Sequence, residues 1–67
     1  MKINVNSSNI KSVDWDAKTL EVDFHRGATY RYSEVPEEVF NQLINAQSVG
    51  KYFNGNIAKH YSSERIK

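Results

Sequence analysis

The segment Ser48-Val49-Gly50-Lys51 carries the residue types of an anion-binding site. Serine is a favoured helix N-cap, and the first amides of a helix point outward at the positive end of its dipole. Gly50 would let an anion approach the backbone, and Lys51 would add a positive charge. The segment is not a P-loop, because that motif's upstream glycine and following serine or threonine are missing. Two interpretations stand: a phosphate or carboxylate site, or an ordinary cap where Gly50 lets a neighbouring element pack closely.

Aromatic and basic side chains in the last third of the chain could bind RNA. Exposed rings of Tyr52 and Tyr61 could stack on bases at ~1–3 kcal/mol each. Alternatively, Tyr52, Phe53 and Tyr61 form the buried stripe of a helix. The cations that could meet phosphates are Lys51, Lys59, Arg65 and Lys67. The candidate residues for nucleic-acid or anion binding are Ser48, Gly50, Lys51, Tyr52, Asn54, Lys59 and His60.

Side chains that could support catalysis are present but follow no catalytic motif. They are Ser7, Ser8, His25, His60, Asp14 and Asp16. No spacing among them orients a nucleophile toward a base. The two aspartates flank Trp15 near a turn, where carboxylates usually serve turn formation and solvation. Two histidines and no cysteine are too few ligands for a metal cluster. We expect no enzyme activity, no metal and no cofactor.

Length and charge limit the class of protein further. A chain of 67 residues forms one domain, and a domain of that size buries only ~60% of its unfolded surface. The net charge is +1, whereas strong nucleic-acid binders are usually more basic. No apolar run approaches the ~18 residues of a membrane span, and no signal-peptide core is present. We therefore expect a cytoplasmic protein without membrane contact, whose thin, aromatic-rich core would also allow self-association.

Three segments show the alternation of β-strands: 10–15, 19–25 and 28–32. In the first, Lys11, Val13 and Trp15 are expected on one face. A turn over 16–19 joins the first two strands, since aspartate is favoured at the first position of such turns. Residues 1–9 are polar and are expected to form an arm or a short edge strand.

The length of the loop between the second and third strands decides where Tyr30 and Tyr32 point. A two-residue turn would place both rings on the polar face of the sheet. A three-residue loop over 25–27, with Gly27 left-handed, places both on the apolar face. We favour the longer loop, which makes these tyrosines mainly structural. The cross-strand pairs that it implies are Val22–Tyr30, Leu20–Tyr32 and Glu21–Arg31. The same test applied to the first hairpin gives Trp15–Leu20 and Val13–Val22.

Two helices are expected after the strands. Pro36 suits a first helical position, and this helix would run to about Gln47. Ser48 would cap a second helix, which Gly55 would bend, shorten or break, at a cost of ~1 kcal/mol. The predicted fold class is α+β, with a three-stranded antiparallel β-meander followed by two α-helices packed on one face. The single domain spans 10–61, between the arm at 1–9 and a polar C-terminal tail at 62–67.

With this layout, the chain resembles the KTSC domain, a family named after the C-terminal ends of lysyl-tRNA synthetases. The resemblance covers nearly everything from Ser7 to Tyr61. Its general parts are Ser7-Ser8, Leu20-x-Val22-x-Phe24 and Val35-Pro36, and its specific parts are Tyr30-x-Tyr32 and Ser48-x-Gly50-Lys51-Tyr52-Phe53-Asn54. One departure is Gly55-Asn56, where longer or basic side chains would be expected, which weakens the expectation of a basic surface at that turn.

The resemblance implies a small, non-enzymatic binding module. Members occur as tails on some lysyl-tRNA synthetases and as stand-alone small proteins of bacterial or phage type. The synthetase context implies RNA as a partner. The alternative is a protein–protein interaction module, because the first strand or the 1–9 arm could pair with a partner at an open sheet edge.

Overall fold

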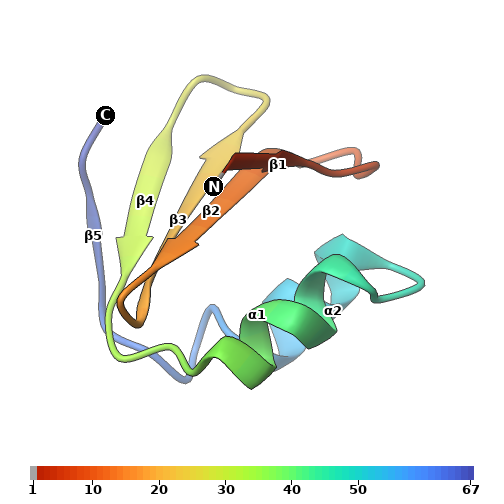
Figure 1. The fold of residues 1–67 in the computed structure, drawn as a ribbon. Helices are drawn as coiled ribbons and strands as arrows, with labels where there is room; N and C mark the ends of the chain where they lie inside the picture. Colours follow the sequence, from red (N-terminus) through yellow and green to blue (C-terminus); the bar gives the residue numbers. More distant parts are fainter. Residues whose placement is uncertain (1) are drawn as a thin grey trace.

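The computed structural model describes residues 2–67, which form a five-stranded sheet and two helices. The elements, in chain order, are β1 (Lys2–Asn4), β2 (Ile10–Asp16), β3 (Thr19–Phe24), β4 (Thr29–Tyr32), α1 (Glu37–Ile44), α2 (Val49–Asn56) and β5 (Ser63–Arg65). All neighbouring strands are antiparallel and lie in sequence order, and both helices cover one face of the sheet (Figure 1). The predicted α+β class and the two helices are therefore confirmed.

The prediction of three strands was wrong, because two short strands flank the meander. Within the 1–9 segment, β1 pairs with β2, with Ile3 opposite Val13. At the other edge, β5 forms from residues predicted as a polar tail and pairs with β4. Every residue of β5 is exposed, so it has no apolar alternation for a sequence pattern to reveal. Backbone hydrogen bonds hold this edge, including the one from the Ile66 amide to the Thr29 carbonyl oxygen (2.9 Å).

The β3–β4 hairpin has the predicted three-residue loop. The Phe24 amide donates to the Ala28 carbonyl oxygen (2.8 Å), and Gly27 has a φ of 97°. Tyr30 and Tyr32 consequently lie opposite Val22 and Leu20, and Glu21 lies opposite Arg31. The register prediction is confirmed, and both tyrosines face the helices.

The β2–β3 hairpin also has the predicted pairs, Trp15 with Leu20 and Val13 with Val22. Its two-residue turn is built from Ala17 and Lys18, whose φ angles are 49° and 67°. Positive φ at both central positions is typical of the turns that match the twist of a hairpin, although glycine and asparagine are the usual residues there. This hairpin therefore holds two ordinary residues in a conformation that costs them free energy.

One expectation for β2 was wrong. A β-bulge shifts the register between Ile10 and Ser12, so that Lys11 is the extra residue and is exposed. Ile10 thereby joins Val13 in the core, whereas simple alternation had placed Lys11 there. A bulge adds one residue to one strand and resets which residues face inward, and no side-chain pattern announces it.

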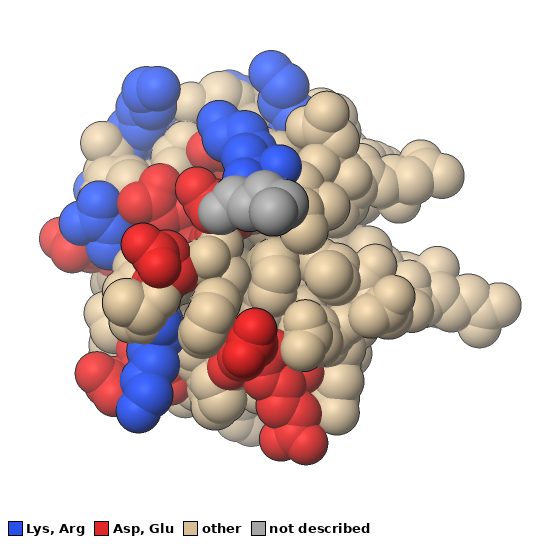
Figure 2. Space-filling model, in the orientation of Figure 1, with Lys and Arg blue, Asp and Glu red and all other residues tan. Residues whose placement is uncertain are grey.

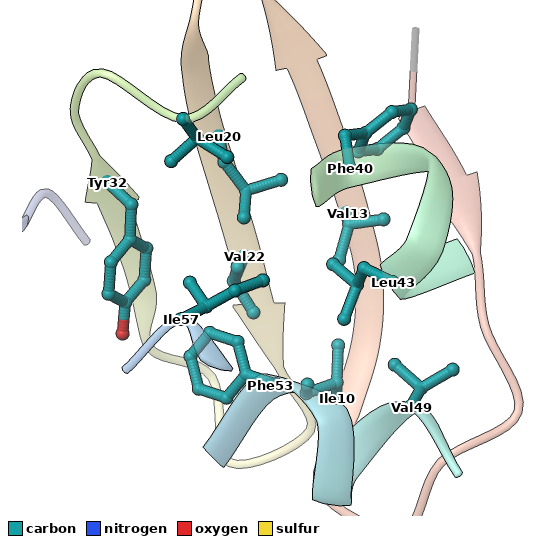
Figure 3. Close-up of a cluster of buried hydrophobic side chains, with 11 residues drawn as sticks. Ile10, Val13, Leu20, Val22, Tyr32, Phe40, Leu43, Val49, Phe53 and Ile57 are labelled. Atoms are coloured by element: carbon teal, nitrogen blue, oxygen red, sulfur yellow. The ribbon is translucent and has the colours of Figure 1, made fainter. Parts of the chain in front are cut away.

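The core fills the space between the sheet and the two helices (Figure 3). Phe40 and Leu43 enter it from α1, and Val49 and Phe53 enter it from α2. Tyr32 is only 5% exposed and meets Phe53 edge-on, with ring centroids 5.4 Å apart. The full cluster comprises Ile10, Val13, Leu20, Val22, Tyr32, Val35, Phe40, Leu43, Val49, Phe53 and Ile57.

Trp15 attaches the chain between β4 and α1 to the sheet. Its indole Nε1–H donates to the Val35 carbonyl oxygen (2.8 Å), and its ring stacks on Phe40 at a centroid distance of 6.0 Å. The Val35 amide in turn donates to the Lys18 carbonyl oxygen (2.7 Å). These contacts set where α1 begins. Pro36 was predicted to be the first helical residue, but it is the N-cap, so α1 begins one residue later, at Glu37.

The second helix begins as predicted and ends at Asn56. The Ser48 side chain accepts from the Lys51 amide, which identifies Ser48 as the N-cap. Gly55 lies inside α2 without interrupting it, one residue before its end. The helix is therefore short, one of the three outcomes that Gly55 suggested.

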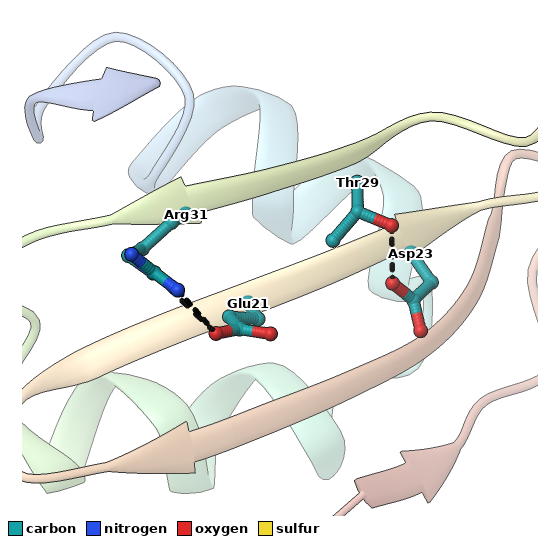
Figure 4. A network of polar contacts seen from close by, with 4 residues as sticks. All are labelled: Glu21, Asp23, Thr29 and Arg31. Atoms are coloured by element: carbon teal, nitrogen blue, oxygen red, sulfur yellow. Dashed lines mark hydrogen bonds and ion pairs between the residues drawn. The ribbon is translucent and has the colours of Figure 1, made fainter. Parts of the chain in front are cut away.

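Polar side chains cover the opposite face of the sheet (Figure 4). Asp23 is at the centre, accepting from Thr29 Oγ1 (2.7 Å) and Ser12 Oγ (2.9 Å) and pairing with Lys2 Nζ at 3.1 Å. These contacts, the Thr29 hydrogen bond first, hold the pKa of Asp23 below its ordinary value, although partial burial opposes them. One carboxylate therefore links β1, β2, β3 and β4.

We expect Gly27→Ala to lower the free energy of unfolding by about 1–2 kcal/mol, because an L-residue is strained in the left-handed region. Steric clash does not contribute, since a Cβ at this glycine would meet nothing within 4 Å. The matched control is Lys18→Gly, which removes a non-glycine residue from a φ of 67° and should be neutral or stabilising. Urea unfolding followed by Trp15 fluorescence measures both. Equal effects of the two variants would contradict the turn assignments.

We expect Tyr32→Ala to lower the free energy of unfolding by about 3–5 kcal/mol, because a buried ring is replaced by a cavity. Tyr32→Phe keeps the ring and removes the hydroxyl that hydrogen-bonds the Ser63 side chain. It should lose only about 1 kcal/mol, the usual net value of a hydrogen bond. Thermal melts of the two variants test this, and a near-neutral alanine variant would show that the ring does not pack in the core.

We expect Asp23 to contribute to acid unfolding. Its folded pKa lies below its ordinary value of 3.8, so its stabilisation is present above that value and is lost as pH falls through the folded pKa. Asp23→Asn should therefore be less stable than the wild type at neutral pH, with the two curves converging in acid. The measurement is the melting temperature of both proteins between about pH 7 and pH 2. A difference between them that stayed constant over this range would contradict the prediction.

Candidate functional site

The β1–β2 connection, the β3–β4 turn and α2 surround a groove made of two adjoining hollows. The first, of ≈360 Å³, lies between the connection and the start of α2. The second, of ≈670 Å³, lies between the connection, the β3–β4 turn and the middle of α2. Both hollows include Ser8, Asn9 and Asn54 in their linings, so they form one continuous surface. We call the first the polar end and the second the aromatic end.

Hydrogen bonds shape the wall of the groove that the β1–β2 connection supplies. The Ser7 hydroxyl accepts from the amides of Asn9 and Ile10, both at 3.3 Å. His25 Nε2–H donates to the Ser7 carbonyl oxygen (3.0 Å), and the His25 amide donates to the Asn9 carbonyl oxygen (2.9 Å). The Ser7-Ser8 segment and the β3–β4 turn are therefore held together, and His25 serves as a structural link.

The polar end contains four of the predicted site residues. Ser48, Gly50, Lys51 and Asn54 all line it. The Ser48 hydroxyl and the Lys51 amide are engaged with each other at 3.4 Å, as in an ordinary cap. A Cβ on Gly50 would lie 3.5 Å from Ser7 Oγ, an ordinary van der Waals distance. Close packing therefore does not require glycine at this position, and the anion-site interpretation of the segment stays a prediction.

The aromatic end is lined by Phe24, Phe53, His25 and Arg26 in addition to the shared residues. The Arg26 guanidinium lies 5.2 Å from the centroid of the Phe24 ring. Phe24 also meets Phe53 edge-on, at a centroid distance of 5.8 Å and an interplanar angle of 71°. This end thus combines an aromatic ring, that of Phe24, with the Arg26 cation above it.

Three of the predicted site residues lie outside the groove. The Tyr52 hydroxyl donates to Gln42 Oε1 on α1 (2.6 Å), and burial, followed by neighbouring Tyr61, raises its pKa. His60 follows α2, and its Nε2 contacts the carbonyl oxygen of Gly55 inside that helix at 3.2 Å. Lys59, also past the end of α2, is exposed. Tyr52, Lys59 and His60 are therefore not among the residues that line either end of the groove.

The residues that sequence analysis missed are those of the aromatic end. Phe24 was expected only in the sheet, and Arg26 only as part of a turn. Asn9 had no role beyond the arm at 1–9. Ser7-Ser8 was noted for the family resemblance and among the side chains that follow no catalytic motif, and it proves to shape the groove wall. No spacing rule connects residues 8, 26 and 54, because only the tertiary fold brings them together.

The candidate catalytic residues are brought together only in part. Ser8 and His25 line the same hollow, and His25 contacts the Ser7 carbonyl oxygen. Asp14 and Asp16 lie with Glu21 at a hollow near the β2–β3 turn, whereas His25 lines the groove. Over residues 2–67, no group of three or more histidine or acidic side chains is placed to hold a metal ion. In the same range, neither helix is long and apolar enough to span a bilayer.

Charge is mixed on one face of the molecule. On the face shown in Figure 2, acidic and basic side chains lie next to one another, with no extended patch of one sign. The groove differs, because the linings of both its ends contain cations and no acidic residue. Acidic side chains line the three other hollows described, one on α1 and two along the sheet.

Comparison with known proteins identifies the family. The sequence model of the KTSC domain matches residues 6–61. The fold agrees with this match. A crystal structure of a KTSC domain protein from Yersinia pestis superposes with a TM-score of 0.92 at 33% identity, covering 100% of this chain and 97% of that one. The chain belongs to the KTSC domain family.

Sequence relatives include stand-alone proteins and a part of a larger enzyme. An uncharacterized protein of Stutzerimonas stutzeri is 40% identical over 97% of this chain and 96% of its own length. A protein of Tsukamurella paurometabola is 45% identical over 76% of this chain and 79% of its own length. A lysine–tRNA ligase of Nostoc punctiforme is 36% identical over 88% of this chain, which corresponds to 11% of the ligase.

Proposed function

We propose that this chain is a non-enzymatic binding module whose partner is RNA and whose contact surface is the groove. The observation that carries the proposal is the charge of this groove. Lys51 contributes to one end and Arg26 to the other, and no acidic side chain lines either end. The chain has eight acidic residues, so a concave surface free of them favours a polyanionic partner.

The groove also offers the hydrogen-bonding groups that nucleic acids use. Hydroxyl and amide side chains, with backbone N–H groups, make many of the phosphate and sugar contacts in such complexes. Ser8, Asn9 and Asn54 supply these groups in the stretch between the two cations.

The family context gives separate support. A segment similar to this chain occurs in the Nostoc lysine–tRNA ligase, whose name specifies a tRNA substrate. Fold similarity alone transfers no activity, so the groove carries the proposal and the relative only agrees with it. With one cation at each end and a net charge of +1, the expected affinity is modest and falls as salt rises.

We expect Lys51→Glu to weaken binding to a single-stranded RNA oligonucleotide and to reduce its salt dependence. Losing one phosphate contact should lower the slope of log K against log salt by about 0.7. The matched control is Lys59→Glu, an identical charge change at an exposed residue outside the groove. Fluorescence anisotropy between 50 and 200 mM salt, with melting temperatures for both variants, measures this.

Each outcome has a distinct consequence. A loss of RNA affinity in Lys51→Glu but not in Lys59→Glu supports the groove as the contact surface. Equal losses of affinity in the two variants would contradict it and indicate binding by a diffuse basic tail. Absence of RNA binding by the wild type at 50 mM salt would contradict RNA as the partner. Capture of a protein partner with little salt dependence would then indicate the protein–protein module instead.

A further inference from the structure

We propose that the aromatic end of the groove holds one unpaired nucleobase of single-stranded RNA, stacked on the Arg26 guanidinium. This inference rests on the proposed function, because it takes RNA as the partner. It adds what is recognised and where: a base face at the β3–β4 turn, in addition to phosphates along the groove.

Two edge contacts fix the aromatic platform beneath Arg26. Phe24 meets Tyr30 at an interplanar angle of 88° and Phe53 at 71°, with both centroid distances 5.8 Å. Phe53 is itself 4% exposed and belongs to the core. The Phe24 ring is therefore held by one buried and one half-buried neighbour, and the arginine lies 5.2 Å from its centroid.

Arg26 is exposed, although its guanidinium lies on this ring. A guanidinium group is planar, so one face can meet Phe24 while the other meets a ligand. Unpaired bases of RNA stack on arginine planes as well as on aromatic rings. The Phe24–Arg26 pair thus provides a preformed stacking surface that carries a positive charge.

The dimensions and lining of this end suit a base with its sugar. Its volume of ≈670 Å³ lies within the ~300–1,000 Å³ typical of small-molecule sites. Ser8, Asn9 and Asn54 line the same hollow with hydroxyl and amide groups, which can meet the polar edges of a base. They also line the polar end, so a phosphate attached to the bound nucleotide would be directed toward Lys51.

Duplex RNA offers no free base face to stack on the Arg26 guanidinium. In an A-form helix the base faces are covered by their neighbours, so only loops, bulges and single strands present a base that can be splayed out. Stacking therefore predicts a preference for single strands. Contacts made by Arg26 to phosphates alone would bind both forms.

The test compares Arg26→Lys with the wild type. Lysine keeps the charge and removes the planar group, so a phosphate contact would be retained and a stacking contact would be lost. We expect affinity for a single-stranded six-nucleotide oligoadenylate to fall at least about fivefold, the lower limit for one stacked base. Affinity for a blunt RNA duplex should be unchanged. Melting temperatures confirm that the variant folds.

A second measurement detects the base directly. In NMR titrations, adenosine 5′-monophosphate should shift the Phe24 ring and Arg26 guanidinium signals, because the adenine ring current acts on them. Ribose 5-phosphate, which has the same phosphate and no base, should leave the Phe24 ring signals in place. Equal shifts with the two ligands would overturn the base site.

The results separate this inference from the proposed function. Unchanged oligoadenylate affinity in Arg26→Lys, together with a loss in Lys51→Glu, would overturn the base site and leave RNA binding intact. Equal losses of single-strand and duplex binding in Arg26→Lys would also overturn it. If the wild type bound neither RNA, the proposed function would fail and this inference with it.

Discussion

The left-handed conformation of Gly27 is the constraint on which the rest of the structure depends. It closes a three-residue loop, and the loop sets the register of β3 against β4. Because side chains alternate along a strand, a shift of one residue would exchange the two faces of β4. Tyr32 would leave the core, and Arg31 would enter it. The same loop presents Arg26 beside Phe24, so one turn determines both the core and the aromatic end of the groove.

The core and the groove share side chains, which links stability to the proposed binding surface. Phe53 packs on Tyr32 inside the molecule and on Phe24 at the groove. A domain this small has little apolar area to spare, so changes to Phe24 or Phe53 would disturb both. Arg26 and Lys51 are exposed residues at the two ends of the groove, and they are therefore the better probes of binding.

Much of the fold could be predicted from the sequence, because strong local signals agree with one another. Alternating residues identified β3, Gly27 fixed its turn, and Ser48 marked the start of α2. The signals failed where backbone geometry acts without side-chain patterning. The bulge at Lys11 follows no hydrophobic period, and β5 is polar throughout and held by its pairing with β4.

The candidate site was predicted only in part, for a related reason. The Ser48–Asn54 segment is continuous in sequence and has the composition of a cap and a cation, so it could be found. The opposite wall comes from the β1–β2 connection and the β3–β4 turn, which are distant from it along the chain. Tyr52, Lys59 and His60 were included as aromatic or basic side chains of the last third of the chain. The helical period directs Tyr52 toward α1, and the other two lie beyond the end of α2.

The most direct measurement of the central claim is the pattern of interstrand NOEs between Hα protons in the β3–β4 hairpin. In an antiparallel pair, these protons approach closely only at the non-hydrogen-bonded positions. With the register observed, close contacts are expected between Asp23 and Thr29 and between Glu21 and Arg31. A contact between Val22 and Arg31 instead would show a two-residue turn, and it would contradict the placement of the tyrosines and of the groove together.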